Sequence, residues 1–284
     1  MLVRFTKMHG LGNDFMLLDL ISQDLHLGED QIRALADRRL GIGFDQLLTV
    51  GPPCDPAADF RYRIFNADGS EVEQCGNGAR CLTRFVRDRG LTTKTHITLE
   101  TNTGRIDCKL EKDGNITVNM GAPRLEPDHI PFSAEQPQIT YELTIPTNIN
   151  QCQSIEPVCI SAINVGNPHA VLTVDDVASA PVAKLGPLIE GHSRFPERVN
   201  VNFMQVLSRS EIALRVYERG VGETLACGTG ACASVVSGRL RGLLDEEVTV
   251  SLPGGDLLIR WEGNESDIYM SGPACRVYEG RLHI

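Results

Sequence analysis

Hydrophobic and polar residues alternate along several short stretches of the chain. The clearest alternation covers residues 60–65, just before the turn Asn66-Ala67-Asp68-Gly69-Ser70. Because successive side chains of a strand point to opposite faces, this pattern predicts a half-buried strand. Strands are also predicted at residues 2–5, 96–101, 105–110 and 116–120. Asp113-Gly114 predicts a hairpin turn between the last two strands.

A helical period replaces the alternation in three stretches. The first is residues 29–39, with an apolar face made of Ile32, Leu35, Ala36 and Leu40. The other two apolar runs follow Cys75 and Cys227, and Gly90 and Gly242 stand where a glycine ends a helix. Basic residues fill the last turns of both runs, where a cation suits the helix dipole. Each cysteine is therefore predicted to lie at the N-terminal end of a helix.

The sequence around these two cysteines occurs twice. Cys75-Gly76-Asn77-Gly78-Ala79-Arg80-Cys81 returns as Cys227-Gly228-Thr229-Gly230-Ala231-Cys232, at an offset of 152 (227 − 75). Further pairs at nearly this offset are Gly12-Asn13 with Gly166-Asn167, Gln46 with Asn200, Asn66 with Glu218, Glu71 with Glu223, and Met120–Pro123 with Met270–Pro273. Several matches in the same order predict an internal duplication.

The duplication predicts two domains in a chain that is long enough for two cores. We expect the first domain to cover residues 1–123 together with 274–284, because a predicted strand at 276–280 returns to it. The second domain then covers residues 124–273. Residues 124–157 are rich in proline and show little periodicity, so we expect a crossover between the domains there, followed by irregular edge strands.

Composition narrows the class of protein. The chain is 42% hydrophobic and 23% charged, as in ordinary globular proteins, and its net charge of -10 argues against a nucleic-acid-binding or membrane-binding surface. The nine cysteines form no Cys-x-x-Cys pair, which argues against a zinc site or a disulfide framework. Residues 1–15 do not resemble a signal peptide, and no run is long enough to span a membrane. We expect a cytoplasmic protein with free thiols.

Two cysteines at two helix starts predict a specific chemistry. Free N–H groups and the helix dipole favour a thiolate there, and helix starts readily bind a carboxylate. If the two domains face each other, one cysteine approaches a bound carbon from each side. One thiolate then removes a proton from one face, and the opposite thiol returns a proton to the other face. This inversion requires no cofactor and no metal.

Less specific interpretations apply to the other candidates. His169 is either structural or tunes a nearby thiol, and Glu218 is either a solvated charge or a partner of a cysteine. Arg219 is either a surface residue or binds a carboxylate through two of its guanidinium nitrogens. The remaining histidines, His9, His26, His96, His129, His192 and His283, are expected to be surface or packing residues. The cysteines expected to behave as small buried hydrophobes are Cys54, Cys81, Cys108, Cys152, Cys159, Cys232 and Cys275.

Over nearly its whole length the chain resembles the diaminopimelate epimerases. The motifs that carry the resemblance are Gly12–Phe15, Phe65–Glu71, Cys75–Cys81, Gly166–His169, Glu218–Gly220, Cys227–Cys232 and Val277–Gly280. The resemblance implies an α/β fold of the α+β type, with two pseudo-symmetric domains that each wrap a curled, mainly antiparallel sheet around a central helix, and an active site in the cleft between them. It also implies a cofactor-independent isomerase that interconverts LL- and meso-2,6-diaminopimelate in the biosynthesis of lysine and cell-wall precursors.

The resemblance implies roles for individual residues. Cys75 and Cys227 are the paired acid and base, and His169 and Glu218 adjust their pKa values. The expected substrate-binding residues are Asn13, Gln46, Asn66, Gly76, Asn77, Asn167, Asn200, Glu218, Arg219, Gly228 and Thr229. Tyr278 matches a position linked to homodimer formation. Neutral amides with one arginine and one glutamate suit a substrate that carries an amino and a carboxyl group at each end, so simple amino acids should be discriminated against.

Three alternatives remain open at this point. A proline or hydroxyproline racemase of the same superfamily would share the second cysteine motif, but it would leave Arg219 and the distal amides without partners. A thiol redox protein would use Cys75 and Cys227 as an oxidisable pair, and peroxide reduction without epimerase activity would favour it. A binding module without catalysis fits only if both thiols are unreactive.

Overall fold

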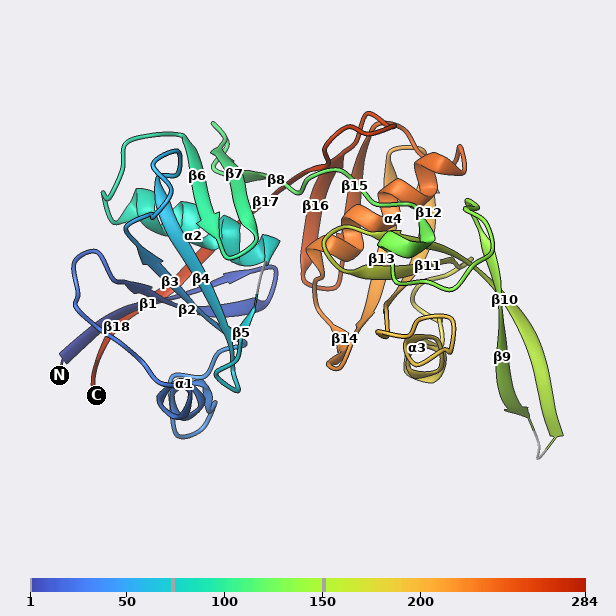
Figure 1. Ribbon diagram of the computed structural model, residues 1–284, viewed down its shortest axis with the longest axis horizontal. Coiled ribbons are helices and arrows are strands. Elements are labelled where there is room, and N and C mark those ends of the chain that lie inside the picture. The colour runs from blue at the N-terminus through green and yellow to red at the C-terminus, as the bar shows by residue number, and fades with distance from the viewer. Residues whose placement is uncertain (1, 73–74, 150–151) are drawn as a thin grey trace. The chain divides into compact units, whose positions relative to one another are not determined.

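The chain folds into two compact units (Figure 1). The computed structural model describes residues 2–72, 75–149 and 152–284. Unit 1 comprises Met1–Asn119 and Ser271–Ile284, and unit 2 comprises Met120–Met270. The fold is mixed α and β, and most of its regular structure is sheet.

Unit 1 contains helices α1 (Glu29–Ala36) and α2 (Gly76–Asp88). Its strands are β1 (Leu2–Gly10), β2 (Asn13–Asp19), β3 (Gln46–Gly51), β4 (Phe60–Asn66), β5 (Glu71–Val72), β6 (His96–Thr101), β7 (Gly104–Leu110), β8 (Ile116–Asn119) and β18 (Cys275–His283). The predicted alternation is visible in β4, where buried and half-buried residues take turns from Phe60 to Phe65. The strands predicted at 96–101, 105–110 and 116–120 are confirmed.

Unit 2 contains the short 3-10 helix η1 (Pro127–His129) and helices α3 (Val182–Glu190) and α4 (Gly228–Leu240). Its strands are β9 (Tyr141–Ile149), β10 (Cys152–Asn164), β11 (Pro168–Thr173), β12 (Asn200–Ser208), β13 (Glu211–Glu218), β14 (Gly222–Thr224), β15 (Glu247–Leu252) and β16 (Gly255–Arg260). Strand β17 (Tyr269–Gly272) crosses the boundary between the units.

The two units repeat one topology. In unit 1, β1 pairs antiparallel with β2, β2 runs parallel to β3, and β3 pairs antiparallel with β4. In unit 2, β10, β11, β12 and β13 follow each other in the same senses. The parallel pairs β4–β6 and β13–β15 also correspond, as do the antiparallel pairs β6–β7 and β15–β16. This agreement supports the duplication that the repeated motifs predict.

One helix lies at the centre of each repeat. Helix α2 packs on β1, β2, β3 and β7, and α4 packs on the corresponding strands β10, β11, β12 and β16. Both helices are 13 residues long and are buried along most of their length. A helix buried on all sides needs small or apolar residues around its whole circumference, and the run Ala231–Gly238 supplies them in α4. Both helices end as predicted, at Gly90 and Gly242 with positive φ.

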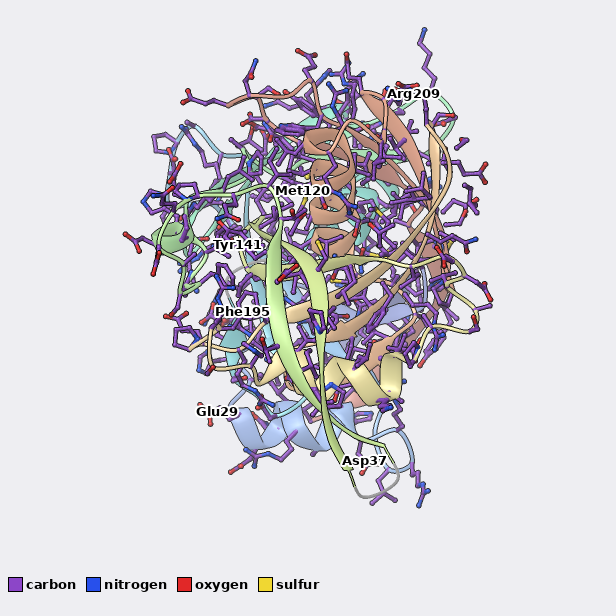
Figure 2. The ribbon with its side chains drawn as sticks, turned by 90° about the vertical axis from the view of Figure 1, so that its right-hand side faces the viewer. Glu29, Asp37, Met120, Tyr141, Phe195 and Arg209 are labelled. Carbon is purple, nitrogen blue, oxygen red and sulfur yellow. The ribbon has the colours of Figure 1, made fainter. Side chains whose placement is uncertain are left out.

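Helix α1 is shorter than predicted. It ends at Ala36, because the Asp37 carboxylate accepts hydrogen bonds from the N–H groups of Arg39 and Leu40 and turns the chain. Leu40 therefore lies outside the helix and is 92% exposed, so its assignment to the apolar face was wrong. Figure 2 labels Glu29 and Asp37 at the two ends of this helix.

The proline-rich stretch is more regular than predicted. Strands β9 and β10 form one long antiparallel hairpin, from the pair Tyr141–Ile160 to the pair Ile149–Cys152, where irregular edge strands were expected. At the base of this hairpin, Phe132 packs edge-on against Tyr141, with ring centroids 4.7 Å apart, and at a tilt against Phe195, with ring centroids 4.6 Å apart. Figure 2 labels Tyr141 and Phe195 in this region.

The end of the chain returns to unit 1. Strand β18 pairs antiparallel with β1, from Leu2 opposite His283 to His9 opposite Cys275, which confirms the predicted returning strand. Among the helices that the structure describes, none has the length and apolar character required to cross a membrane.

Candidate active site

Cys75 is the N-cap residue of α2, as predicted. Its Sγ accepts a hydrogen bond from the Gly78 N–H at 3.4 Å, so the sulfur satisfies one of the free donors of the first helical turn. The Tyr62 hydroxyl on β4 donates to the Cys75 carbonyl at 3.2 Å. Tyr62 is fully buried, and burial raises its pKa well above the usual value, so it stays a neutral donor. The Cys75 side chain is half-buried.

A row of amides begins at the Cys75 sulfur. The thiol lies 3.8 Å from Asn13 Oδ1, which also accepts a hydrogen bond from Asn77 Nδ2 at 3.3 Å. Asn77 Oδ1 in turn accepts from Arg80 Nη2 at 3.0 Å. Arg80 is fully buried, and its Nε donates to the Pro273 carbonyl at 3.2 Å. Sequence reasoning missed Arg80, although a charged residue inside a glycine-rich motif was a signal that could have found it.

Two more predicted residues of unit 1 lie side by side on neighbouring strands. Gln46 begins β3 directly opposite Asn66 on β4, and Gln46 Nε2 donates to Asn66 Oδ1 at 3.1 Å. Asn66 Nδ2 donates to Ser70 Oγ at 3.2 Å. Gln46 Oε1 is buried and has no hydrogen-bond partner among the described residues. A buried acceptor without a partner is costly, so a donor from a ligand would stabilise it.

Cys227 is the N-cap residue of α4, in the position that corresponds to Cys75. It is 4% exposed, and its Sγ lies 3.5 Å from Thr229 Oγ1. Burial raises the pKa of the Cys227 thiol well above its usual value, and the negative charge of Glu218 raises it further. The helix start alone predicted a stabilised thiolate. At Cys227, burial and the Glu218 carboxylate act against the donors of the first turn and favour the thiol.

Glu218 is a partner of this cysteine and not an isolated surface charge. It ends β13, is half-buried, and accepts a hydrogen bond from Thr224 Oγ1 at 2.5 Å. Its effect on the pKa of Cys227 agrees with the predicted interaction between the two residues.

His169 is fully buried at the start of β11. Its Nδ1 lies 3.1 Å from Asn202 Oδ1, and Asn202 Nδ2 donates to Gly230 O at 2.8 Å and to Ser234 Oγ at 3.1 Å. The Asn202 amide nitrogen donates to two acceptors, so the side-chain oxygen of Asn202 must accept a hydrogen bond from the Nδ1–H group of His169. The contact with Asn202 therefore selects the neutral Nδ1–H tautomer of His169.

The other ring nitrogen of His169, Nε2, is an acceptor in this tautomer and lies 2.9 Å from the Asn167 side-chain amide, so that amide must direct its NH2 group toward the ring. Burial and the nearby positive charge of Arg219 together lower the pKa of His169 to about 4, against the opposing effect of the bond to Asn202. The imidazole is therefore neutral near pH 7. Sequence reasoning missed Asn202, which no local motif marked.

Asn200 and Arg219 meet where β12 begins and β13 ends. Asn200 is buried, donates from Nδ2 to Pro168 O at 3.0 Å, and accepts from the Arg219 N–H at 2.9 Å. The Arg219 side chain is exposed, and its Nη1 donates to Glu197 O at 2.9 Å. Its remaining guanidinium nitrogens leave room for bidentate binding of a carboxylate.

The other cysteines divide into two groups. Cys81, Cys108 and Cys232 are buried as expected, and burial raises the pKa of Cys108 to about 12. Cys54, Cys159 and Cys275 are exposed, so their assignment as buried hydrophobes was wrong: each lies in a loop or an outer strand that leaves its side chain uncovered. The side chain of Cys152 lies outside the described residues.

Tyr278 lies on β18 in unit 1. Its ring contacts Phe5 edge to face, with centroids 5.9 Å apart, and the residue is 43% exposed. Across residues 2–72, 75–149 and 152–284, the structure contains no group of three or more His, Cys, Asp or Glu side chains that could hold a metal ion.

Solved structures share this fold. A PhzF-family phenazine biosynthesis protein of Bacillus anthracis aligns with a TM-score of 0.69 at 17% identity, over 100% of both chains. A hydroxyproline epimerase from Agrobacterium vitis aligns with a TM-score of 0.66 at 14% identity, over 99% of this chain and 92% of that chain. At such low identities the similarity concerns the fold alone.

Sequence comparison is more specific. A sequence model of the diaminopimelate epimerase family matches residues 5–126 and 161–277. The chain is 60% identical over 286 residues to the diaminopimelate epimerase of Thioalkalivibrio sulfidiphilus (strain HL-EbGR7), and 57% identical over 284 residues to that of Ectopseudomonas mendocina (strain ymp). Both alignments cover 100% of each chain. The chain therefore belongs to the diaminopimelate epimerase family, a family of isomerases.

Proposed function

We propose that Cys75 and Cys227 are the acid–base pair with which this chain interconverts LL- and meso-2,6-diaminopimelate, a step of lysine biosynthesis. The observation that carries the proposal is their equivalent placement. Each is the N-cap of a buried 13-residue helix, at the same point of the repeated topology. Among the described residues, no other cysteine is the N-cap of a helix.

The reaction inverts one carbon without oxidation or reduction. One thiolate sulfur takes the α-proton, and the electron pair of the broken C–H bond is left on the carbon and its carboxylate. The other thiol then delivers its proton to the opposite face, so one S–H bond forms as the other breaks. The backbone N–H groups of Gly76, Asn77, Gly228 and Thr229 belong to the first turns of the two helices and are suited to bind the carboxylate as its charge grows.

The polar residues beside each cysteine suit the two ends of the substrate. Asn13, Asn66, Asn167 and Asn200 supply neutral amides, and the buried Gln46 Oε1 supplies an acceptor for an ammonium group. Arg219 and Glu218 supply one charge of each sign. We propose that this set holds the distal amino-acid group while the near carbon is inverted, so that an analogue without the distal group leaves buried polar atoms unpaired.

Neither of the two residues expected to adjust the cysteine pKa values supplies a positive charge that would stabilise a thiolate. His169 is neutral because it is buried, and therefore supplies no positive charge that would stabilise a thiolate. Glu218 raises the pKa of Cys227. We propose that Cys227 rests as the thiol, and that binding of a cationic substrate amine reduces the effect of Glu218 during turnover.

The test is deuterium incorporation at the α-carbon. LL-diaminopimelate is incubated with reduced protein in D2O, and both label and isomer are measured. We expect label to appear together with the meso isomer, and Cys75→Ala and Cys227→Ala each to lower turnover by at least about 100-fold. Cys54→Ala is the matched control and should keep full activity. A folded, reduced wild-type protein that exchanges nothing from either isomer would overturn the proposed function.

The same assay separates the alternatives. Comparable turnover of proline or hydroxyproline would favour a racemase of the shared fold, and comparable turnover of alanine or glutamate would contradict the proposed distal contacts. Peroxide consumption that depends on both cysteines, in protein without epimerase activity, would favour a redox protein.

We also propose that the chain is a homodimer in the cytoplasm. The free state of every described cysteine supports a reducing compartment. The exposed apolar residues on β18 support the dimer.

A further inference from the structure

The turn Gly41–Gln46 carries a carboxylate whose contacts lead back to the Cys75 thiol. Asp45 Oδ2 accepts hydrogen bonds from Asn13 Nδ2 and from the Asp14 N–H, both at 3.0 Å. Asp45 Oδ1 accepts from Arg38 Nη2 at 2.7 Å. None of these charged residues belongs to the set proposed to contact the substrate.

A second acid and a buried lysine hold the arginine in place. Arg38 donates to both carboxylate oxygens of Asp14, at 2.8 and 3.0 Å. Lys7 is buried, and its Nζ donates to Asp14 Oδ2 at 2.5 Å and to the Gly43 carbonyl. Although burial opposes it, hydrogen bonds from Arg38 and Lys7 lower the pKa of Asp14 to about 2. Arg38, which is itself held by Asp14 and Lys7, thus fixes the direction of the Asp45 carboxylate.

These contacts determine which way the Asn13 amide points. A carboxylate only accepts hydrogen bonds, so Asn13 must turn Nδ2 toward Asp45. At the other end of the row, Arg80 only donates, so Asn77 must turn Oδ1 toward Arg80 and Nδ2 toward Asn13. Both ends require the same orientation, with Asn13 Oδ1 facing Cys75 Sγ at 3.8 Å.

We propose that Asp45 is a positioning residue that keeps the Asn13 amide oxygen directed at the Cys75 thiol. The inference rests on the proposed acid–base role of Cys75. An amide oxygen accepts the S–H hydrogen and repels a thiolate, whereas the Gly78 N–H at 3.4 Å favours the thiolate. Asn13 therefore balances the helix start and keeps Cys75 able to act as an acid. Tyr62 and Cys81 also lie close enough to interact with the charge on Cys75, and burial raises both of their pKa values, so they stay neutral.

The substitution Asp45→Asn tests this role. Arg38 only donates, so the side-chain oxygen of the new amide at position 45 stays directed at Arg38. The side-chain nitrogen of that amide then faces Asn13 Nδ2, and two hydrogen-bond donors oppose each other. Asn13 then leaves its position, and Cys75 loses its acceptor. We measure the rate of Cys75 alkylation by iodoacetamide against pH, without substrate, by mass spectrometry of the peptide. The pH of half-maximal rate should fall by roughly one unit, and kcat/KM for diaminopimelate should fall roughly 10- to 100-fold.

Two further variants make the test decisive. Asp59→Asn is the matched control, because Asp59 also binds a cation, Lys94, and a backbone N–H, that of Thr98, in the same unit. It should leave the alkylation profile unchanged. Asn13→Ala should reproduce the shift, and adding Asp45→Asn to Asn13→Ala should produce no further shift.

An unchanged profile in Asn13→Ala would overturn the inference even if Asp45→Asn failed to fold. Additive shifts in the double variant would also overturn it, because Asp45 would then act on Cys75 by another route. The alkylation measurement needs no turnover. A wild-type protein that fails the deuterium assay but shows these shifts would therefore overturn the proposed function and not the positioning role.

Discussion

His169 shows how burial of one residue links folding to pH. Its pKa falls from 6.5 to about 4 on folding, because the buried site penalises the imidazolium. The unfolded chain therefore binds more protons between these values, and the contribution of the neutral histidine is fully present above pH 6.5 and is lost as the pH falls toward 4. The difference corresponds to about 3 kcal/mol of unfolding free energy.

We expect the unfolding free energy of unit 2 to depend less on pH in His169→Gln than in the wild type between about pH 4 and 6.5. Urea unfolding can be followed by the fluorescence of Trp261, the single tryptophan of the chain, which is buried in unit 2. His192→Gln is the control, because His192 is a half-buried histidine of the same unit. Equal slopes for His169→Gln and the wild type would show that His169 is not held neutral by the fold.

Single residues also show which properties of the site the sequence alone could not predict. The motif around Cys227 correctly predicted an N-cap, because glycines and the following apolar run are local signals. It did not predict that the thiol is the favoured form, because the burial that raises its pKa most depends on how the fold packs around the sulfur and not on the local motif. Arg80 and Asn202 were missed for the same reason, since their roles depend on partners that only the fold supplies.

At the scale of elements, the contact between α2 and β4 depends on a missing side chain. A Cβ atom on Gly78 would overlap the Tyr62 hydroxyl, the group that donates to the Cys75 carbonyl. Gly78→Ala should lower the stability of unit 1 by about 1–3 kcal/mol, because overpacking outweighs the better helix propensity of alanine.

Hydrogen exchange of the α2 peptide, residues 76–88, measures this effect. Gly78→Ala should exchange faster throughout the helix. Gly51→Ala is the matched control, because a Cβ there meets nothing within 4 Å. Protection equal to that of the wild type would mean that Tyr62 moves aside at no cost, and that its bond to the Cys75 carbonyl does not hold the helix start.

Elements in which hydrophobic and polar residues follow one regular period were predictable. Elements whose period is contradicted by prolines or by a turn residue were not. Strands β6, β7 and β8 follow the alternation closely. The β9–β10 hairpin was missed because Pro146 and Pro157 lie within its strands, and proline argues against a strand when the sequence is considered alone. Helix α1 was extended too far because the helical period continues past the Asp37 turn.

At the scale of the whole molecule, β18 exposes more apolar surface than a strand usually does. Five consecutive residues, Cys275–Glu279, are exposed, and they include Val277 at 56% and Tyr278 at 43%. Successive side chains of a strand point to opposite faces, so apolar groups are uncovered on both. Such exposure is typical of a protein–protein contact. It fits the homodimer that the resemblance implies for Tyr278.

We expect Tyr278→Glu to shift the chain from a dimer toward a monomer of 31.1 kDa, as measured by sedimentation equilibrium at micromolar concentration. A buried, unpaired carboxylate at a contact is unfavourable enough to dissociate an interface of ordinary size. Leu40→Glu is the matched control, because Leu40 is an exposed apolar residue of the same unit at 92% exposure, outside β18. Loss of the dimer in Tyr278→Glu alone would place the contact on β18. If both variants sediment like the wild type, a dimer that uses this strand is contradicted, and Tyr278 serves only to pack on Phe5.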